Sequence, residues 1–188
     1  MPLGALLIGV TLWAWGQPLV STSGEIRLWV NSIWSRETSQ QVADWYSLSH
    51  LIHGMLVALI GRALSSRVSW TVVVAFALVT GVAWEIVEHT DMVLDHFRGQ
   101  TIYQGYVGDT VLNAVCDYIF MLAGFFLGAS APVWALVAFI LLLEVLSASL
   151  ARDSLLLSTL RVVYPVPAIS AWQDATNPLK TPGLPPAD

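Results

Sequence analysis

The sequence predicts an all-α fold, a polytopic membrane bundle of about five transmembrane helices with additional interfacial helices. Composition is the first observation behind this prediction: 56% of the 188 residues are hydrophobic and only 11% are charged, whereas soluble domains carry about 25% charged residues. The mean hydropathy is +0.67. The second observation is five apolar segments, each with roughly the 20 residues that a helix needs to cross a bilayer. The chain is therefore expected to be an integral membrane protein.

The five predicted spans form one bundle domain, 1–173, followed by a proline-rich tail, 174–188. The spans lie at 3–22, 46–64, 68–90, 108–128 and 132–150. Because no Lys or Arg precedes the first, we expect a retained span rather than a signal peptide. The links "GRALSSRVS" and "GASAPVW" are short, so the second and third spans, and the fourth and fifth, are expected to form hairpins. The longer connections then lie at the opposite end, with an interfacial helix expected at 154–164.

Charge and cysteine content exclude several classes of function. The net charge of −5 is spread along the chain, so neither a nucleic-acid footprint nor a polybasic lipid-binding patch is expected. Cys116 is the single cysteine, which rules out an intramolecular disulfide and a thiolate metal cluster. A metal site in this chain is therefore expected to be built mainly from histidine and carboxylate ligands.

Ionisable and polar residues of four spans are predicted to meet in one leaflet, because each set lies at a span end that faces the longer connections. The sets are His50 and His53; Glu85, Glu88 and His89; Asp109, Asn113 and Asp117; and Glu144, with Arg152 and Asp153 just beyond its span. Spacings of three and four residues put each of the first three sets on one side of its helix. Ionisable residues inside a membrane cost about 2.5–3.5 kcal/mol each on insertion scales and usually serve a function.

These residue types predict a divalent metal site within the bundle. We expect His50, His53, Glu85 and Asp117 to be ligands, with Glu88 and Asp109 as further ligands or a general base. Arg152, with Arg36 as a second candidate, is expected to hold an anionic headgroup. The spacing of "EIVEH" matches no established metal motif, so zinc, manganese, iron and magnesium all stay open.

Other interpretations of the same residues stay open at this point. His50 and His53 can be interfacial histidines that bond to loop carbonyls, and the carboxylates can pair with Arg152 in a purely structural network. An accessory or assembly subunit of a larger membrane complex would need no more than that. A proton-coupled carrier is a third class, but the hairpin end carries few intramembrane polar residues and so offers no evident path across the membrane.

Four segments resemble a bacterial inner-membrane family described as a domain of unknown function. They are "SQQVADWYSLSHLIHG", "AWEIVEHT", "YVGDTVLNAVCDYIFMLAGF" and "ARDSLLLSTLRVVYPVPAISAWQ", within about 37–173. The polar positions typical of the family are matched at His50, His53, Glu85, Glu88, Asp109, Asn113, Asp117, Arg152 and Asp153. "GDTVLNAVCDYIFMLAGFFLG" is also distantly similar to VanZ-like membrane proteins, a resemblance that implies a cell-envelope or lipid context. The resemblance to the family implies a multi-pass protein of the inner membrane.

Together these observations predict a metal-dependent hydrolase or transferase that acts on a lipid or lipid-linked substrate at one leaflet. The alternative expectation is a non-catalytic accessory subunit, whose partner would be another protein of the membrane complex. Nucleic acid is expected in neither case.

Overall fold

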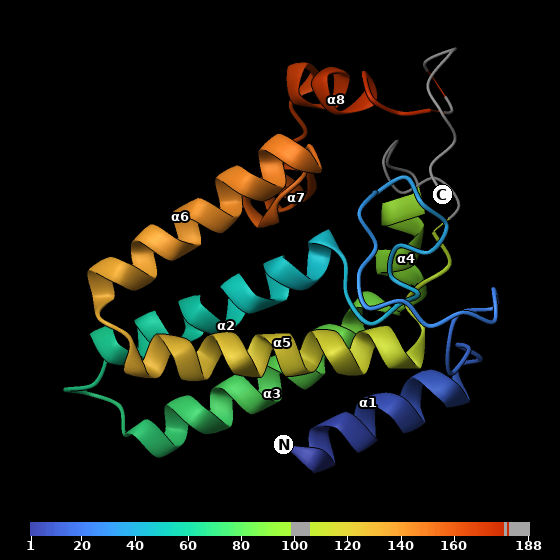
Figure 1. The fold of residues 1–188 in the computed structure, drawn as a ribbon. Coiled ribbons are helices and arrows are strands. Elements are labelled where there is room, and N and C mark those ends of the chain that lie inside the picture. The colour runs from blue at the N-terminus through green and yellow to red at the C-terminus, as the bar shows by residue number, and fades with distance from the viewer. Residues whose placement is uncertain (99–105, 179, 181–188) are drawn as a thin grey trace.

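The computed structural model describes residues 1–98, 106–178 and 180, apart from the side chain of His96, and all regular secondary structure within these ranges is helical (Figure 1). The helices are α1 (Pro2–Ala14), α2 (Trp45–Ala63), α3 (Trp70–Glu88), α4 (Asp91–Arg98), α5 (Val111–Ser130), α6 (Val133–Leu150), α7 (Leu155–Val163) and α8 (Pro167–Asp174). This confirms the all-α prediction. The interfacial helix expected at 154–164 corresponds to α7, whereas α4 and α8 were not predicted.

Three helices of the described residues, α3, α5 and α6, are long and apolar enough to cross a membrane, fewer than the five predicted. The predicted span 3–22 is wrong in length, because α1 ends at Ala14. Gly16 follows with a φ of +94°, a left-handed conformation that ends a helix, and Pro18 lacks an N–H to extend one. Thirteen residues rise only about 20 Å, against about 30 Å of hydrocarbon.

Helix α2 has 19 residues but is less apolar than α3, α5 or α6. Its polar residues, among them His50, His53 and Arg62, lower its hydropathy. Helices α3, α5, α6 and α7 all contact α2, and nine of its residues are buried. The helix that carries the histidines therefore lies in the interior of the bundle.

Glycines bring α2 and α5 into backbone contact. A Cβ at Gly54 of α2 would collide with the carbonyl oxygen of Met121, and a Cβ at Gly124 of α5 would collide with that of Leu51. Small residues allow helices to approach this closely where lipid offers no hydrophobic driving force. Gly54 and Gly124 therefore set the short distance between α2 and α5.

The other helices pack around this pair. Tyr118 of α5 fills the space beside Gly4 of α1 and Gly81 of α3, and it is almost fully buried. On the other side of α2, Met55 packs with Leu136 of α6. Helix α6 thus covers the side of α2 that α3 and α5 leave free.

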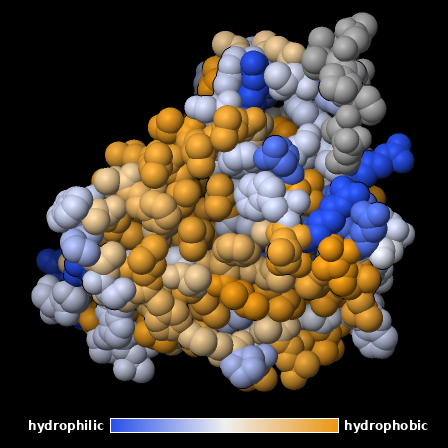
Figure 2. All heavy atoms as spheres, viewed as in Figure 1, coloured by the Kyte–Doolittle hydropathy of each residue, from blue (hydrophilic) through white to orange (hydrophobic). Residues whose placement is uncertain are grey.

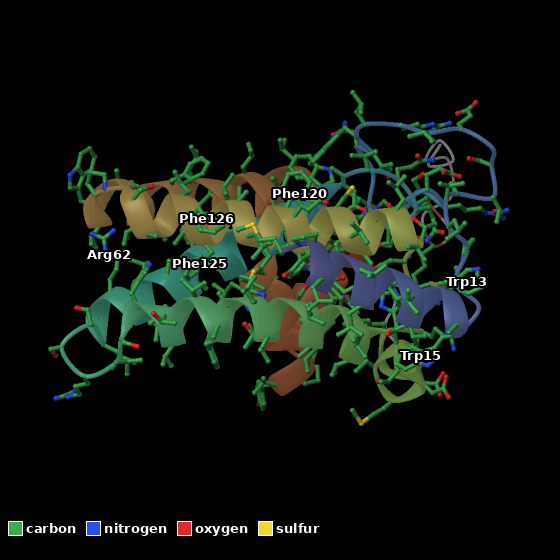
Figure 3. The ribbon with its side chains drawn as sticks, turned by 90° about the horizontal axis from the view of Figure 1, so that it is seen from below. Trp13, Trp15, Arg62, Phe120, Phe125 and Phe126 are labelled. Carbon is green, nitrogen blue, oxygen red and sulfur yellow. The ribbon has the colours of Figure 1, made fainter. Side chains whose placement is uncertain are left out.

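The two ends of the bundle differ in chemistry. At the hairpin end, Arg62 donates hydrogen bonds to the carbonyl oxygens of Gly128, in the last turn of α5, and of Ala131, just after it. Figure 3 shows Arg62 at the opposite end of the bundle from Trp13 and Trp15. The long connections gather at that second end. Figure 2 shows apolar side chains over the bundle and hydrophilic ones mainly at its ends, as expected for a surface in contact with lipid.

We predict that Gly54→Ala destabilises the protein by about 1–3 kcal/mol, because the added methyl group overpacks the α2–α5 contact. Thermal unfolding in detergent measures the effect. Gly9→Ala is the matched control, since a Cβ at Gly9 of α1 meets only Val111, at 3.4 Å. Equal unfolding temperatures for the two variants would contradict the role assigned to Gly54.

Candidate functional site

His50 of α2 lies between a carboxylate of α3 and a carboxylate of α5. Its Nδ1 is 3.2 Å from Glu85 Oε1, and its Nε2 is 3.8 Å from Asp117 Oδ2. His50 is 9% exposed, Glu85 1% and Asp117 2%. The close contact of α2 with α5 at Gly54, one turn after His50, brings His50 near Asp117. Residues from three of the four predicted polar sets therefore meet here.

A second group of oxygens lies on the other side of Glu85. Glu85, Glu88 and Asp109 each offer one carboxylate oxygen, and these oxygens lie within 4.8 Å of one another. Glu85 and Glu88 are one turn apart on α3, whereas Asp109 comes just before α5. Glu85 therefore belongs both to the His50 contact and to this carboxylate trio.

Several oxygens of the cluster have no hydrogen-bond partner among the described residues. They are Oε2 of Glu85, Oε2 of Glu88 and Oδ1 of Asp117, and all three are buried. A buried ionised carboxylate is unfavourable unless a charge or a donor compensates it. The cluster consequently has unused capacity to bind cations or protons.

His89 has a structural position instead. Its Nε2 accepts the backbone N–H of Asp109 at 2.9 Å, so in that bond Nε2 carries no proton. The proton is then on Nδ1, which donates to the carbonyl oxygen of Glu85 at 2.7 Å. His89 is therefore a neutral imidazole with both nitrogens used, and the 3.6 Å separation of Nε2 from the Asp109 carboxylate is not an ion pair.

The connection before α2 closes the cluster from the loop end. Asp44 caps α2: its oxygens accept the N–H groups of Tyr46 and Ser39, and Ser47 completes the capping box. Burial raises the pKa of Asp44, although these two N–H bonds oppose the rise. Ser47 also lies beside Asp117. The first turn of α2 is thus tied to the site.

Residues 39–41 join this connection to the start of α5. Gln40 donates to the carbonyl oxygen of Gly108 at 2.9 Å, and Thr110 donates to that of Gln40 at 3.1 Å. Asn113, buried on α5, donates to the carbonyl oxygen of Gln41. The predicted polar residue Asn113 therefore fixes a loop, while its neighbours on the same face point into the cluster.

The fourth predicted set does not join the cluster, which corrects the expectation that all four meet at one point. Glu144 accepts the N–H of Leu156 at the start of α7, and Arg152 donates to the carbonyl oxygen of Trp172 with its guanidinium over the Trp172 ring. The physical reason is that α6 packs on the far side of α2, and its end leads into α7 and α8 (Figure 1).

Asp153 lies at the centre of a second buried polar network, between α2, α7 and α8. It accepts from Tyr46 and Ser158 and lies 3.8 Å from the guanidinium of Arg161, which bonds to Gln173. Burial raises the pKa of Asp153, and Arg161 opposes the rise. This network attaches the two last helices to the first turn of α2.

Of the remaining predicted site residues, His53 is half-buried one turn after His50 and makes no hydrogen bond with the part of the chain that the structure describes. Sequence reasoning missed two contributors. One is Ser47, for which the favourable N-cap residue Asp44 three positions earlier is the available signal. Tyr106, which donates to Asp109 at 2.5 Å, carries no such signal.

The family model described as "Protein of unknown function (DUF2585)" matches residues 12–175. The chain is similar to the UPF0314 protein of Paracoccus denitrificans, with 40% identity over 164 residues, 87% of this chain and 84% of that protein. It is 37% identical to the UPF0314 protein of Sphingopyxis alaskensis over 169 residues, 90% and 89% of the two chains. With UPF0314 protein R03235 of Rhizobium meliloti the identity is 38% over 172 residues, 91% and 87%.

No solved structure matches the chain. The resemblance to a family of unknown function is confirmed by these comparisons, and the distant similarity to VanZ-like proteins stays a prediction.

We predict that Arg161→Met lowers the free energy of unfolding by about 3 kcal/mol, because it removes the cation that balances buried Asp153. The pKa of Asp153 is already raised by burial. Above this pKa the variant holds a buried negative charge with no cation beside it, whereas below it Asp153 is protonated and needs none. The loss of unfolding free energy in the variant should therefore shrink as the pH falls through the pKa of Asp153. Thermal unfolding in detergent at several pH values measures both effects.

Lys180→Met is the control, since Lys180 pairs with Asp174 while 43% of its side chain stays exposed, and such pairs contribute less than about 1 kcal/mol. Combining Arg161→Met with Asp153→Asn should restore part of the loss. A pH-independent deficit would show that Asp153 is not the group involved.

Proposed function

The chain belongs to the family described as "Protein of unknown function (DUF2585)", and from its polar cluster we propose that it is a metal-dependent enzyme of the bacterial inner membrane. In this proposal it hydrolyses or transfers a group of a lipid or lipid-linked substrate. Glu85, Glu88 and Asp109 hold a divalent metal ion. The observation that carries the proposal is the convergence of three carboxylate oxygens within 4.8 Å, where Glu85 and Glu88 each keep a buried oxygen without a partner.

Oxygen-rich sites favour hard cations, so magnesium or manganese is the expected ion, with zinc and iron as the other candidates. Such an ion supplies Lewis-acid chemistry: it polarises an ester or phosphoryl oxygen and lowers the pKa of bound water. His50 supports the site by directing a ring N–H at Glu85 Oε1, which leaves Oε2 for the ion. Tyr106 holds Asp109 in the same way.

The proposed orientation in the membrane has four crossings, α2, α3, α5 and α6, with α2 shielded from lipid by its neighbours, while α1 is inserted beside α3 and α5 without spanning. The cluster then lies in one leaflet, close to the headgroups. Apolar residues on the outer face of α3, such as Val79 and Val87, are exposed and would contact acyl chains. A substrate that arrives laterally from the bilayer suits this position. Arg152 is not assigned to a substrate headgroup in this proposal, because its guanidinium is engaged by Trp172.

We predict that detergent-purified protein carries at least one stoichiometric divalent ion, and that Glu88→Gln weakens its binding at least tenfold. The reason is that the variant removes one charged ligand of the trio. Elemental analysis and metal titration measure this, with the folded state checked by thermal unfolding. Glu25→Gln is the control, because Glu25 is exposed and pairs with Arg27 on a loop. Folded wild-type protein that binds no divalent ion would refute the metal site.

A second candidate function, a non-catalytic subunit of a membrane complex, is favoured by one observation. His89, Asn113 and Asp44 all use their polar groups to hold loops and helix ends together, as a purely structural polar network would. Co-purification separates the two functions. A stoichiometric protein partner, together with full biological function of Glu85→Gln, would favour the subunit.

A further inference from the structure

We propose that the cluster holds a second divalent ion, between His50 Nε2 and Asp117, beside the ion assigned to the carboxylate trio. The inference rests on the proposed metal-dependent function and deepens it to a two-ion site. It starts from the two nitrogens of one buried ring. Nδ1 lies 3.2 Å from Glu85 Oε1, the shorter of the two contacts that the ring makes with a carboxylate, so we assign the ring proton to this nitrogen.

With the proton on Nδ1, the lone pair of Nε2 faces Asp117. The separation of Nε2 from Oδ2 is 3.8 Å, longer than a hydrogen bond. Two acceptors that face each other in a buried site repel unless a cation lies between them. A histidine that donates one N–H to a carboxylate and binds a metal through its other nitrogen is a common arrangement at protein metal sites.

Asp117 has the remaining features of a ligand. It is 2% exposed, and its Oδ1 has no hydrogen-bond partner among the described residues. Ser47 of α2 lies beside it, and the Ser47 hydroxyl oxygen accepts the N–H of Asp44 at 3.1 Å. The carboxylate therefore has Ser47 on one side and an oxygen without a partner, Oδ1, on the other.

Charge balance gives an independent reason for two ions. Four carboxylates, those of Glu85, Glu88, Asp109 and Asp117, lie in the cluster, and within the described ranges the basic side chains beside them are histidines, with no Lys or Arg among them. His89 is neutral by its hydrogen bonds. One divalent ion neutralises half of this negative charge, and a second neutralises the rest. Glu85 links the two sites, since Oε1 meets His50 while Oε2 is free for the trio.

The test is a Zn²⁺ titration of the full chain in detergent, with bound metal counted after removal of excess ion. Zn²⁺ is the probe because nitrogen and oxygen sites bind it more tightly than manganese. We expect two ions per wild-type chain, and one each for Asp117→Asn and Glu88→Gln. His50→Gln also should bind one, because its amide can still donate to Glu85. Glu25→Gln should bind two, and thermal unfolding confirms that each variant is folded.

If the folded wild type binds one ion only, the second site is overturned, whichever variant removes that ion, and a protonated His50 ring balances the charge of Asp117 instead. If that one ion is lost in Glu88→Gln, the proposed metal-dependent function still stands. A count of zero overturns the metal-dependent function as well. A count of two that Asp117→Asn and His50→Gln leave unchanged also overturns the proposal.

Discussion

The backbone contact between α2 and α5 is the constraint on which the rest of the structure depends. Gly54 and Gly124 have no side chain to separate the helices, so the two backbones meet one turn from the polar residues. His50 thereby comes within reach of Asp117, and α3, packed against α5, adds Glu85. The glycines carry no chemistry themselves, yet a wider helix spacing would separate the imidazole from the carboxylates.

The cluster combines two kinds of polar residue with opposite energetic roles. His89 has both ring nitrogens engaged by the backbone, so its burial is largely compensated, and Asn113 donates to a loop carbonyl although its own Oδ1 has no partner among the described residues. Glu85, Glu88 and Asp117 each keep a buried oxygen without a partner, which is unfavourable for folding. The residues that bond to the backbone therefore hold the three carboxylates in place. This division is typical of a site in which the fold sustains a locally unfavourable arrangement for a ligand.

Sequence patterns predicted the helical class, the two hairpins and the convergence of three polar sets, because apolar length and helical spacing are local properties. The prediction failed where distant packing decides. Glu144 has the depth of a cluster residue, but α6 lies on the other side of α2 and directs it to α7. The end of α1 depends on Gly16 and on contacts of 18–19 with the start of α5. The role of Tyr106, likewise, follows only from the folded arrangement.

The network around Asp153 also bears on how the protein is made. The first turn of α2 is bonded through Tyr46 to Asp153, and Asp153 is bonded in turn to Gln173 of the last helix. During synthesis α2 and α5 leave the ribosome long before α8 does, so the polar turn before His50 lacks these contacts while the later helices are being inserted. The bundle is therefore complete only when the carboxyl-terminal helices have been made. A nascent chain that ends before 173 would leave the polar groups around Asp153 without these bonds, and cellular quality control acts on such incompletely folded chains.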